Sequence, residues 1–171
     1  MDVSQPMPSS QIAEVIKRWA PYGRSGLLPC LQEIQDLVGY LSPAVCNEVS
    51  RGLRVPLADI YGVITFYSLL YDHPIGRVVV RVCDDVPCYL RGSTQVLTAL
   101  EEALQIRAGE TTADGGITLE VHPCLGRCER APFLLINDQE VGPVRPDEAV
   151  AKVHQARKQQ LASEPGSGLP E

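Results

Sequence analysis

Four of the chain's six cysteines lie in two close pairs, and this arrangement suits the binding of a metal or a cluster. Cys83 and Cys88 form a C-x4-C pair, and Cys124 and Cys128 form a C-x3-C pair after 35 intervening residues. Each pair comes directly after a segment with the character of a β-strand. If the two strands are parallel neighbours, both loops leave the same edge of the sheet. The pattern therefore predicts one site at which four thiolates converge.

Several kinds of site could use such thiolates. Iron–sulfur clusters are held by cysteines, and loops that wrap the cluster are suited to this. Four cysteines can also bind zinc, although their pairs usually lie close together in a compact ribbon. A thioredoxin-type redox site needs a C-x-x-C pair, which the sequence lacks. Structural disulfides suit an oxidising compartment. Spacing alone favours a 2Fe–2S cluster and leaves zinc and disulfides as alternatives.

The remaining candidates for chemistry have simpler interpretations. Cys30 and Cys46 fall on apolar faces of helical segments, where a free cysteine behaves as a small buried hydrophobe. His122 precedes Pro123-Cys124, but a histidine-ligated cluster of the Rieske type needs two histidines on one iron. His73 and His154 are distant in sequence. We therefore expect His122 to be a polar residue on a strand face.

Charge and sequence patterns exclude several functions. A net charge of −6 is unsuited to nucleic acid, and no apolar run is long enough for membrane insertion. The first residues, MDVSQPMPSS, lack the basic start and apolar run of a secretory signal. We expect a cytoplasmic protein that could associate with a membrane only through a complex. No glycine-rich dinucleotide fingerprint or phosphate loop occurs, so we expect no flavin, NADH or catalysis on the isolated chain.

Residues 9–72 are predicted to form a small helical bundle. Apolar residues recur at helical spacing in the first segment: Ile12, Val15, Ile16 and Trp19. Residues 27–41 repeat the pattern. Ser42 and Pro43 then supply an N-cap and a first-turn proline for a third helix, which Gly52 is predicted to end. A fourth helix is predicted to start at Pro56.

Residues 77–160 are predicted to form a domain of a different type. The β-branched run at 78–82 indicates a buried strand, and residues 93–104 a helix. The next strand has apolar residues alternating with polar ones, which predicts that its apolar side chains are buried. These apolar residues are Ile117, Leu119 and Val121.

A predicted hairpin at 133–141, with its turn at Asn137-Asp138, and a last helix at 146–160 complete the domain. The tail, residues 161–171, is predicted to be disordered. A strand–helix–strand unit makes a right-handed crossover into a parallel sheet. The predicted fold is therefore α/β, a thioredoxin-like domain preceded by a helical bundle.

Five blocks of the sequence, taken in order, carry a resemblance to a known family. They are LLPCLQEIQDLVGYL, VPLADIYGVITFYSLL, GRVVVRVCDDVPCYLRGS, GETTADGGITLE and HPCLGRCERAPFLLIND. The second half resembles the thioredoxin-like 2Fe–2S ferredoxins. Over residues 12–153 the chain resembles the E subunit (24 kDa type) of respiratory complex I and its relatives in NAD-linked hydrogenases and formate dehydrogenases.

The resemblance implies a function and a ligand set. The implied ligands of one 2Fe–2S cluster are Cys83, Cys88, Cys124 and Cys128. The chain would be an electron-transfer subunit of a complex I-type NADH:quinone oxidoreductase. Its expected partner is the flavin- and NADH-binding subunit (51 kDa type), which would hold FMN and NAD(P)H. The alternatives are the same module in a hydrogenase or formate dehydrogenase, and a zinc-stabilised interaction module without redox activity.

Residues beside the cysteines bear on the reduction potential. Pro87 has no N–H to donate to a cluster sulfur. A carboxylate at Glu129 would lower the potential of an anionic cluster, whereas Arg127 or Arg130 would raise it. The net effect depends on which of these side chains face the cluster.

Overall fold

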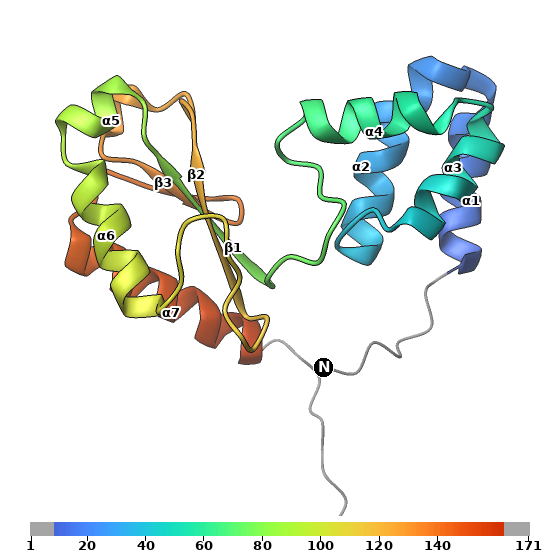
Figure 1. The fold of residues 1–171 in the computed structure, drawn as a ribbon. Helices are drawn as coiled ribbons and strands as arrows, with labels where there is room; N and C mark the ends of the chain where they lie inside the picture. The colour runs from blue at the N-terminus through green and yellow to red at the C-terminus, as the bar shows by residue number, and fades with distance from the viewer. Residues whose placement is uncertain (1–8, 163–171) are drawn as a thin grey trace, which may run out of the picture. The chain divides into compact units, whose positions relative to one another are not determined.

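The computed structural model describes residues 9–162, which divide between Ile75 and Gly76 into two compact units (Figure 1). We call residues 9–75 the helical unit and residues 76–162 the sheet unit, and describe each by itself. Within residues 9–162, no helix combines the length and the apolar character needed to cross a bilayer.

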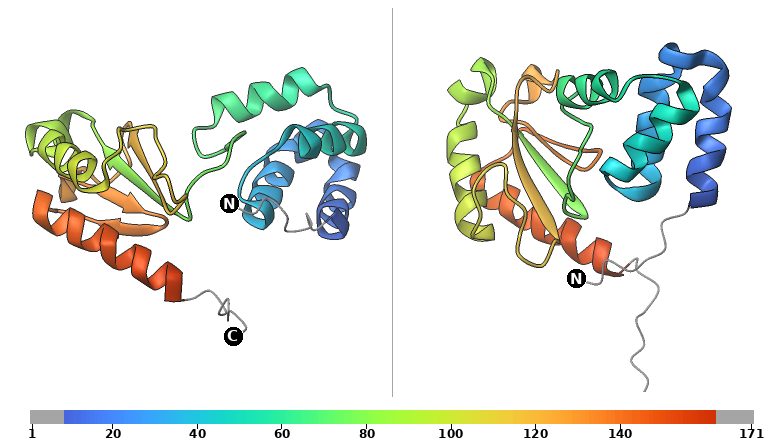
Figure 2. Two further views of the ribbon diagram at one scale, coloured as in Figure 1. Left: turned by 60° about the horizontal axis from the view of Figure 1, so that its bottom comes forward. Right: turned by 45° about the vertical axis from the view of Figure 1, so that its right-hand side comes forward.

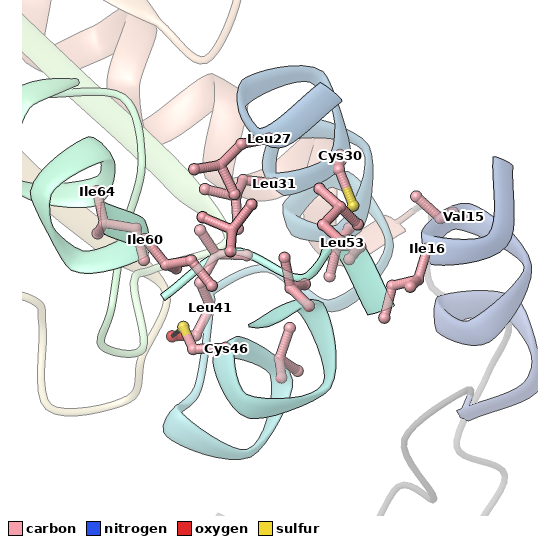
Figure 3. Packing of buried hydrophobic residues seen from close by; sticks show 14 of the residues in the cluster. Val15, Ile16, Leu27, Cys30, Leu31, Leu41, Cys46, Leu53, Ile60 and Ile64 are labelled. Atoms are coloured by element: carbon pink, nitrogen blue, oxygen red, sulfur yellow. Dashed lines mark hydrogen bonds between the residues drawn. The ribbon is translucent and has the colours of Figure 1, made fainter. Parts of the chain in front are cut away.

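The helical unit consists of four α-helices and one 3-10 helix. They are α1 (Ser9–Trp19), η1 (Ala20–Gly26), α2 (Leu27–Val38), α3 (Pro43–Leu53) and α4 (Leu57–Phe66). Side chains from all four α-helices meet in one apolar core (Figure 3). Cys30 and Cys46 both lie in this core with no exposed surface, which confirms the prediction that they are buried. The Ser42 hydroxyl accepts a hydrogen bond from the Val45 N–H, so the predicted N-cap of α3 is also confirmed.

The predicted end of α3 at Gly52 is wrong. The helix continues through Gly52 to Leu53, and the left-handed residue that follows is Arg54, with a φ of 56°. A Cβ atom at position 52 would collide with Cγ2 of Ile16 on α1. The glycine is therefore needed for the close approach of α1 and α3 rather than for ending a helix.

We expect Gly52→Ala to destabilise the helical unit by about 1–3 kcal/mol, because overpacking outweighs alanine's better helix propensity. The fluorescence of Trp19, the chain's single tryptophan, would follow unfolding in urea. Gly62→Ala is the matched control, since a Cβ there meets no atom within 4 Å. That variant should be as stable as the parent or more so. Equal midpoints for the two variants would contradict the packing role of Gly52.

The sheet unit contains four strands and three α-helices. Its elements are β1 (Val78–Cys83), α5 (Val86–Leu90), α6 (Ser93–Leu104), β2 (Ile117–His122), η2 (Cys128–Arg130), β3 (Leu134–Ile136), β4 (Gln139–Val141) and α7 (Pro146–Ala162). The strand order is β2-β1-β3-β4; β1 and β2 are parallel, and the other neighbours are antiparallel. The predicted α/β, thioredoxin-like fold class is confirmed.

Helices α6 and α7 pack against each other and against the sheet (Figures 1 and 2). Alternate residues of β1 enter the same core as residues of both helices. The core contributions are Val78, Val80 and Val82 from β1, Val96 and Leu100 from α6, and Ala149 and Val153 from α7. This core fixes β1, and with it the position of the residues that follow the strand.

Burial along β2 differs from the predicted alternation. Ile117 and Leu119 are buried as predicted, but Val121 is 37% exposed. Residues 109–112 lie along the outer edge of β2 and form backbone hydrogen bonds with it, but these bonds extend only to Leu119. Thr118 is buried although it is polar, because its hydroxyl accepts the Gly76 N–H at 2.6 Å and bonds the Thr111 hydroxyl at 2.8 Å.

The last helix also differs from its predicted length. α7 continues through Ala162, two residues into the tail that was predicted to be disordered. The rest of that predicted tail, residues 163–171, lies outside the described residues.

Candidate metal centre

Both cysteine loops leave the sheet at the same edge. Cys83 is the last residue of β1 and pairs with His122, the last residue of β2. The Asp84 N–H donates to the His122 carbonyl at 3.2 Å, which continues the pairing past the strand ends. Cys124 follows two residues later. The shared sheet edge that the sequence predicted from two parallel strands is therefore present.

The first cysteine pair is buried. Cys83 is 2% exposed and Cys88 is 1% exposed. Cys88 lies on α5, a helix that the sequence analysis missed. The Asp85 carboxylate caps this helix by accepting the Val86 N–H at 2.8 Å. Pro87 sits in the first turn, where no intrahelical bond needs its N–H. A capping aspartate followed by an early proline was the signal that could have revealed α5.

Phe133 closes the buried half of the site. It packs with Ala131 against Cys83 and Cys88. Its carbonyl accepts the Cys83 N–H at 3.1 Å. Burial raises the pKa of the Cys88 thiol, with a further rise from its hydrogen bond to Cys83, whereas the Phe133 backbone lowers it.

The second cysteine pair is exposed, and its thiols are close together. The Sγ atoms of Cys124 and Cys128 are 3.6 Å apart. The Gly126 N–H donates to Cys124 Sγ at 3.4 Å, in a loop where Gly126 has a φ of 77°. The hydrogen bond to Cys124 is the main cause of a raised pKa at Cys128; burial and the negative charges of Cys124, Asp85 and Cys83 also contribute.

The two halves act on each other electrostatically. Negative charge on Cys128 raises the pKa of Cys88, and negative charge on Cys83 raises that of Cys128. Four neighbouring thiolates would repel one another, and a bound cationic core would relieve that repulsion.

Across residues 9–162, no three or more His, Cys, Asp or Glu side chains are arranged around a single metal-ion position. His122 Nδ1 lies 3.0 Å from the Pro123 carbonyl.

The charged neighbours of the exposed half are tied to strand β4. Arg127 donates to Glu140 Oε1 from Nε at 2.9 Å and from Nη2 at 2.6 Å. Arg130 donates to Glu140 Oε2 at 2.9 Å and to the Gly142 carbonyl at 2.8 Å. The charge of exposed Glu129 contributes weakly to a raised pKa at Arg127, which comes mainly from Glu140. Sequence analysis missed Glu140, because only the β3–β4 pairing brings it to this loop.

We expect alkylation of the cluster-free, folded chain to separate the six thiols into three classes. The thiolate is the reactive form, so exposure and a low pKa favour reaction. Exposed Cys124 and Cys128 should react first, buried Cys83 and Cys88 more slowly. Cys30 and Cys46 are completely buried in the helical core, where burial raises their pKa values, to about 12 for Cys30, so they should react only on unfolding.

Mass spectrometry after timed iodoacetamide treatment measures this order. A denatured sample, in which all six thiols should react, is the control. Early modification of Cys30 or Cys46 in the folded chain would contradict the burial of these thiols.

Comparison with known proteins places the chain among relatives of one kind. The sequence profile of the thioredoxin-like [2Fe-2S] ferredoxin family matches residues 12–157. The E subunit of the NADH-quinone oxidoreductase of Pseudomonas aeruginosa is 39% identical over 78% of this chain and 80% of its own length. The E 2 subunit of the same kind of oxidoreductase in Rhizobium meliloti is 43% identical over 71% of this chain and 73% of its own length.

A solved structure gives a likeness of fold. A chain of an NAD+-reducing [NiFe]-hydrogenase in the air-oxidized state superposes with a TM-score of 0.69 over 84% of this chain, at 24% identity. This chain spans only 24% of that hydrogenase chain. The likeness extends the confirmation of the fold to both units.

Proposed function

We propose that four cysteines hold the single [2Fe–2S] cluster of this chain, which belongs to the thioredoxin-like [2Fe-2S] ferredoxin family. The four proposed ligands are Cys83, Cys88, Cys124 and Cys128. The observation that carries the proposal is the pairing of Cys83 with His122 at the shared end of two parallel strands. Both cysteine loops start from that edge.

The donor set fits the cluster chemically. Thiolates are the usual ligands of both irons, and amides directed at the sulfurs stabilise their negative charge. Gly126 supplies such an amide to Cys124, and the Phe133 backbone lowers the pKa of Cys88. When bound, a [2Fe–2S] cluster takes up and releases one electron at a time.

The chain is an electron-transfer subunit of the complex I type and part of a larger oxidoreductase, as its family and its relatives among NADH-quinone oxidoreductase subunits indicate. We propose that it exchanges electrons with a partner subunit that binds FMN and NADH. Phe133 and Ala131 keep water from the buried thiols, whereas Cys124 and Cys128 are exposed. The exposed half is therefore the proposed side for electron exchange. Thiolates that must stay reduced support a reducing interior, the cytoplasm, as the compartment.

Metal analysis tests the cluster. The full chain, purified and reconstituted without oxygen, should contain about two irons and two sulfides and give a paramagnetic resonance signal on reduction. A colourless, redox-silent protein that contains zinc would reject the proposal in favour of a structural metal site.

Isolation of the native complex tests the partner. A tagged copy of the full chain should co-purify with a flavin-containing subunit that oxidises NADH. Recovery with a hydrogenase or formate dehydrogenase would assign the module to that complex, and recovery without any flavoprotein would contradict the proposed partner.

A further inference from the structure

One carboxylate ties the exposed cysteine loop to the sheet. Glu140 pairs with Leu135 across the β3–β4 hairpin, so the hairpin fixes its backbone. Its two oxygens bind different arginines: Oε1 takes both bonds from Arg127, and Oε2 takes one from Arg130. Arg127 lies between the two exposed cysteines in sequence, and Arg130 lies two residues after the second.

Arg127 and Arg130 donate most of their side-chain hydrogen bonds to Glu140, which makes this carboxylate the main side-chain anchor of the loop. Arg130 also donates to the Gly142 carbonyl, and its guanidinium lies 5.9 Å from the Phe133 ring centre. The backbone adds local bonds, from the Arg130 N–H to the Arg127 carbonyl and from the Ala131 N–H to the Cys128 carbonyl. These local bonds shape the turn, whereas the Glu140 contacts join it to another strand.

The three charges also add up to a net value. Arg127 and Arg130 contribute two positive charges and Glu140 one negative charge, so the group carries +1 beside the exposed thiols. Reduction adds an electron to a cluster that is already negative, so nearby positive charge favours it and negative charge opposes it. Glu140 thus offsets part of the arginines' effect.

We propose that Glu140 is a positioning residue for the cluster, which holds the loop of Cys124 and Cys128 in place and lowers the reduction potential. This inference rests on the proposed function and deepens it. Partly exposed ion pairs contribute little to the stability of a fold. If Glu140 acted only on folding stability, its substitution would therefore leave the reduction potential of the cluster and the rate of iron loss unchanged.

Charge and reach are tested by separate variants of the full chain. Glu140→Gln removes the charge but keeps the length, and Glu140→Asp keeps the charge but shortens the reach. Glu102→Gln is the matched control, because it removes one exposed carboxylate from α6 in the same unit. The measurements are a redox titration of the reduced-state resonance signal and the rate at which a chelator removes iron.

We expect Glu140→Gln to increase the equilibrium constant for reduction several-fold, where tenfold corresponds to about 59 mV for one electron. It should also speed iron removal several-fold. Glu140→Asp should keep a potential near that of the parent and lose iron faster, and Glu102→Gln should change neither.

Three results would overturn the inference. A potential in Glu140→Gln equal to that of Glu102→Gln would refute the charge role. An equal shift in Glu140→Asp and Glu140→Gln would refute it too. Iron removal at the parent rate in both Glu140 variants would refute the positioning role. A parent chain without iron and sulfide would instead reject the proposed function, so the two failures are distinguishable.

Discussion

Replacing Cys124 by alanine is expected to abolish the [2Fe–2S] cluster, while the chain stays folded. A methyl group has no lone pair to donate to iron, so the site would lose one of its four donors. Cys124 is exposed, so its substitution removes little packing. The measurements are iron and sulfide content, the reduced-state resonance signal, and Trp19 fluorescence as a check on folding.

Cys30→Ala is the informative control for this experiment. Cys30 has no exposed surface and lies in the core of the helical unit. Its truncation should cost about 1 kcal/mol of stability through a small cavity and leave the cluster intact. If both variants retained iron and sulfide, or if Cys30→Ala lost the cluster, the ligand assignment would be wrong.

Much of the fold could be predicted from the sequence, because hydrophobic periodicity and local signals agreed with tertiary packing. The β-branched run at 78–82 became β1, and the hairpin at 133–141 formed around Asn137, whose side chain accepts the Val79 N–H at 2.8 Å. Parallel pairing of the two predicted strands brought both cysteine loops to one edge, as the position of each cysteine pair after a predicted strand had indicated.

The failures have a common physical origin in contacts between distant segments. The local sequence around Gly52 is typical of a helix end, but a glycine is required there because Ile16 of another helix occupies the space of a side chain. Val121 follows the alternating pattern, but the covering segment stops short of it. Glu140 gains its role from arginines ten and thirteen residues earlier in the chain. A local sequence pattern does not identify these distant contact partners.

Phe133→Ala is expected to destabilise the sheet unit strongly and to expose the buried cysteines. The ring is fully buried against the cysteines, and its truncation should lower the free energy of unfolding by about 3–5 kcal/mol. It should also open the buried thiols to water, so that oxygen or a chelator destroys the bound cluster faster. Urea unfolding followed by circular dichroism and the decay of the cluster's visible absorbance measure the two effects.

Leu100→Ala separates loss of cover from loss of stability. Leu100 has no exposed surface and lies on α6, in the core cluster that does not include the cysteines. Its truncation should cost about 2–5 kcal/mol, which is comparable to the cost at Phe133. Urea can be used to bring the two variants to the same free energy of unfolding. If Phe133 shields the site, the cluster should then decay faster in Phe133→Ala than in Leu100→Ala. Equal decay rates under that condition would mean that Phe133 acts on the cluster only through the stability of the fold.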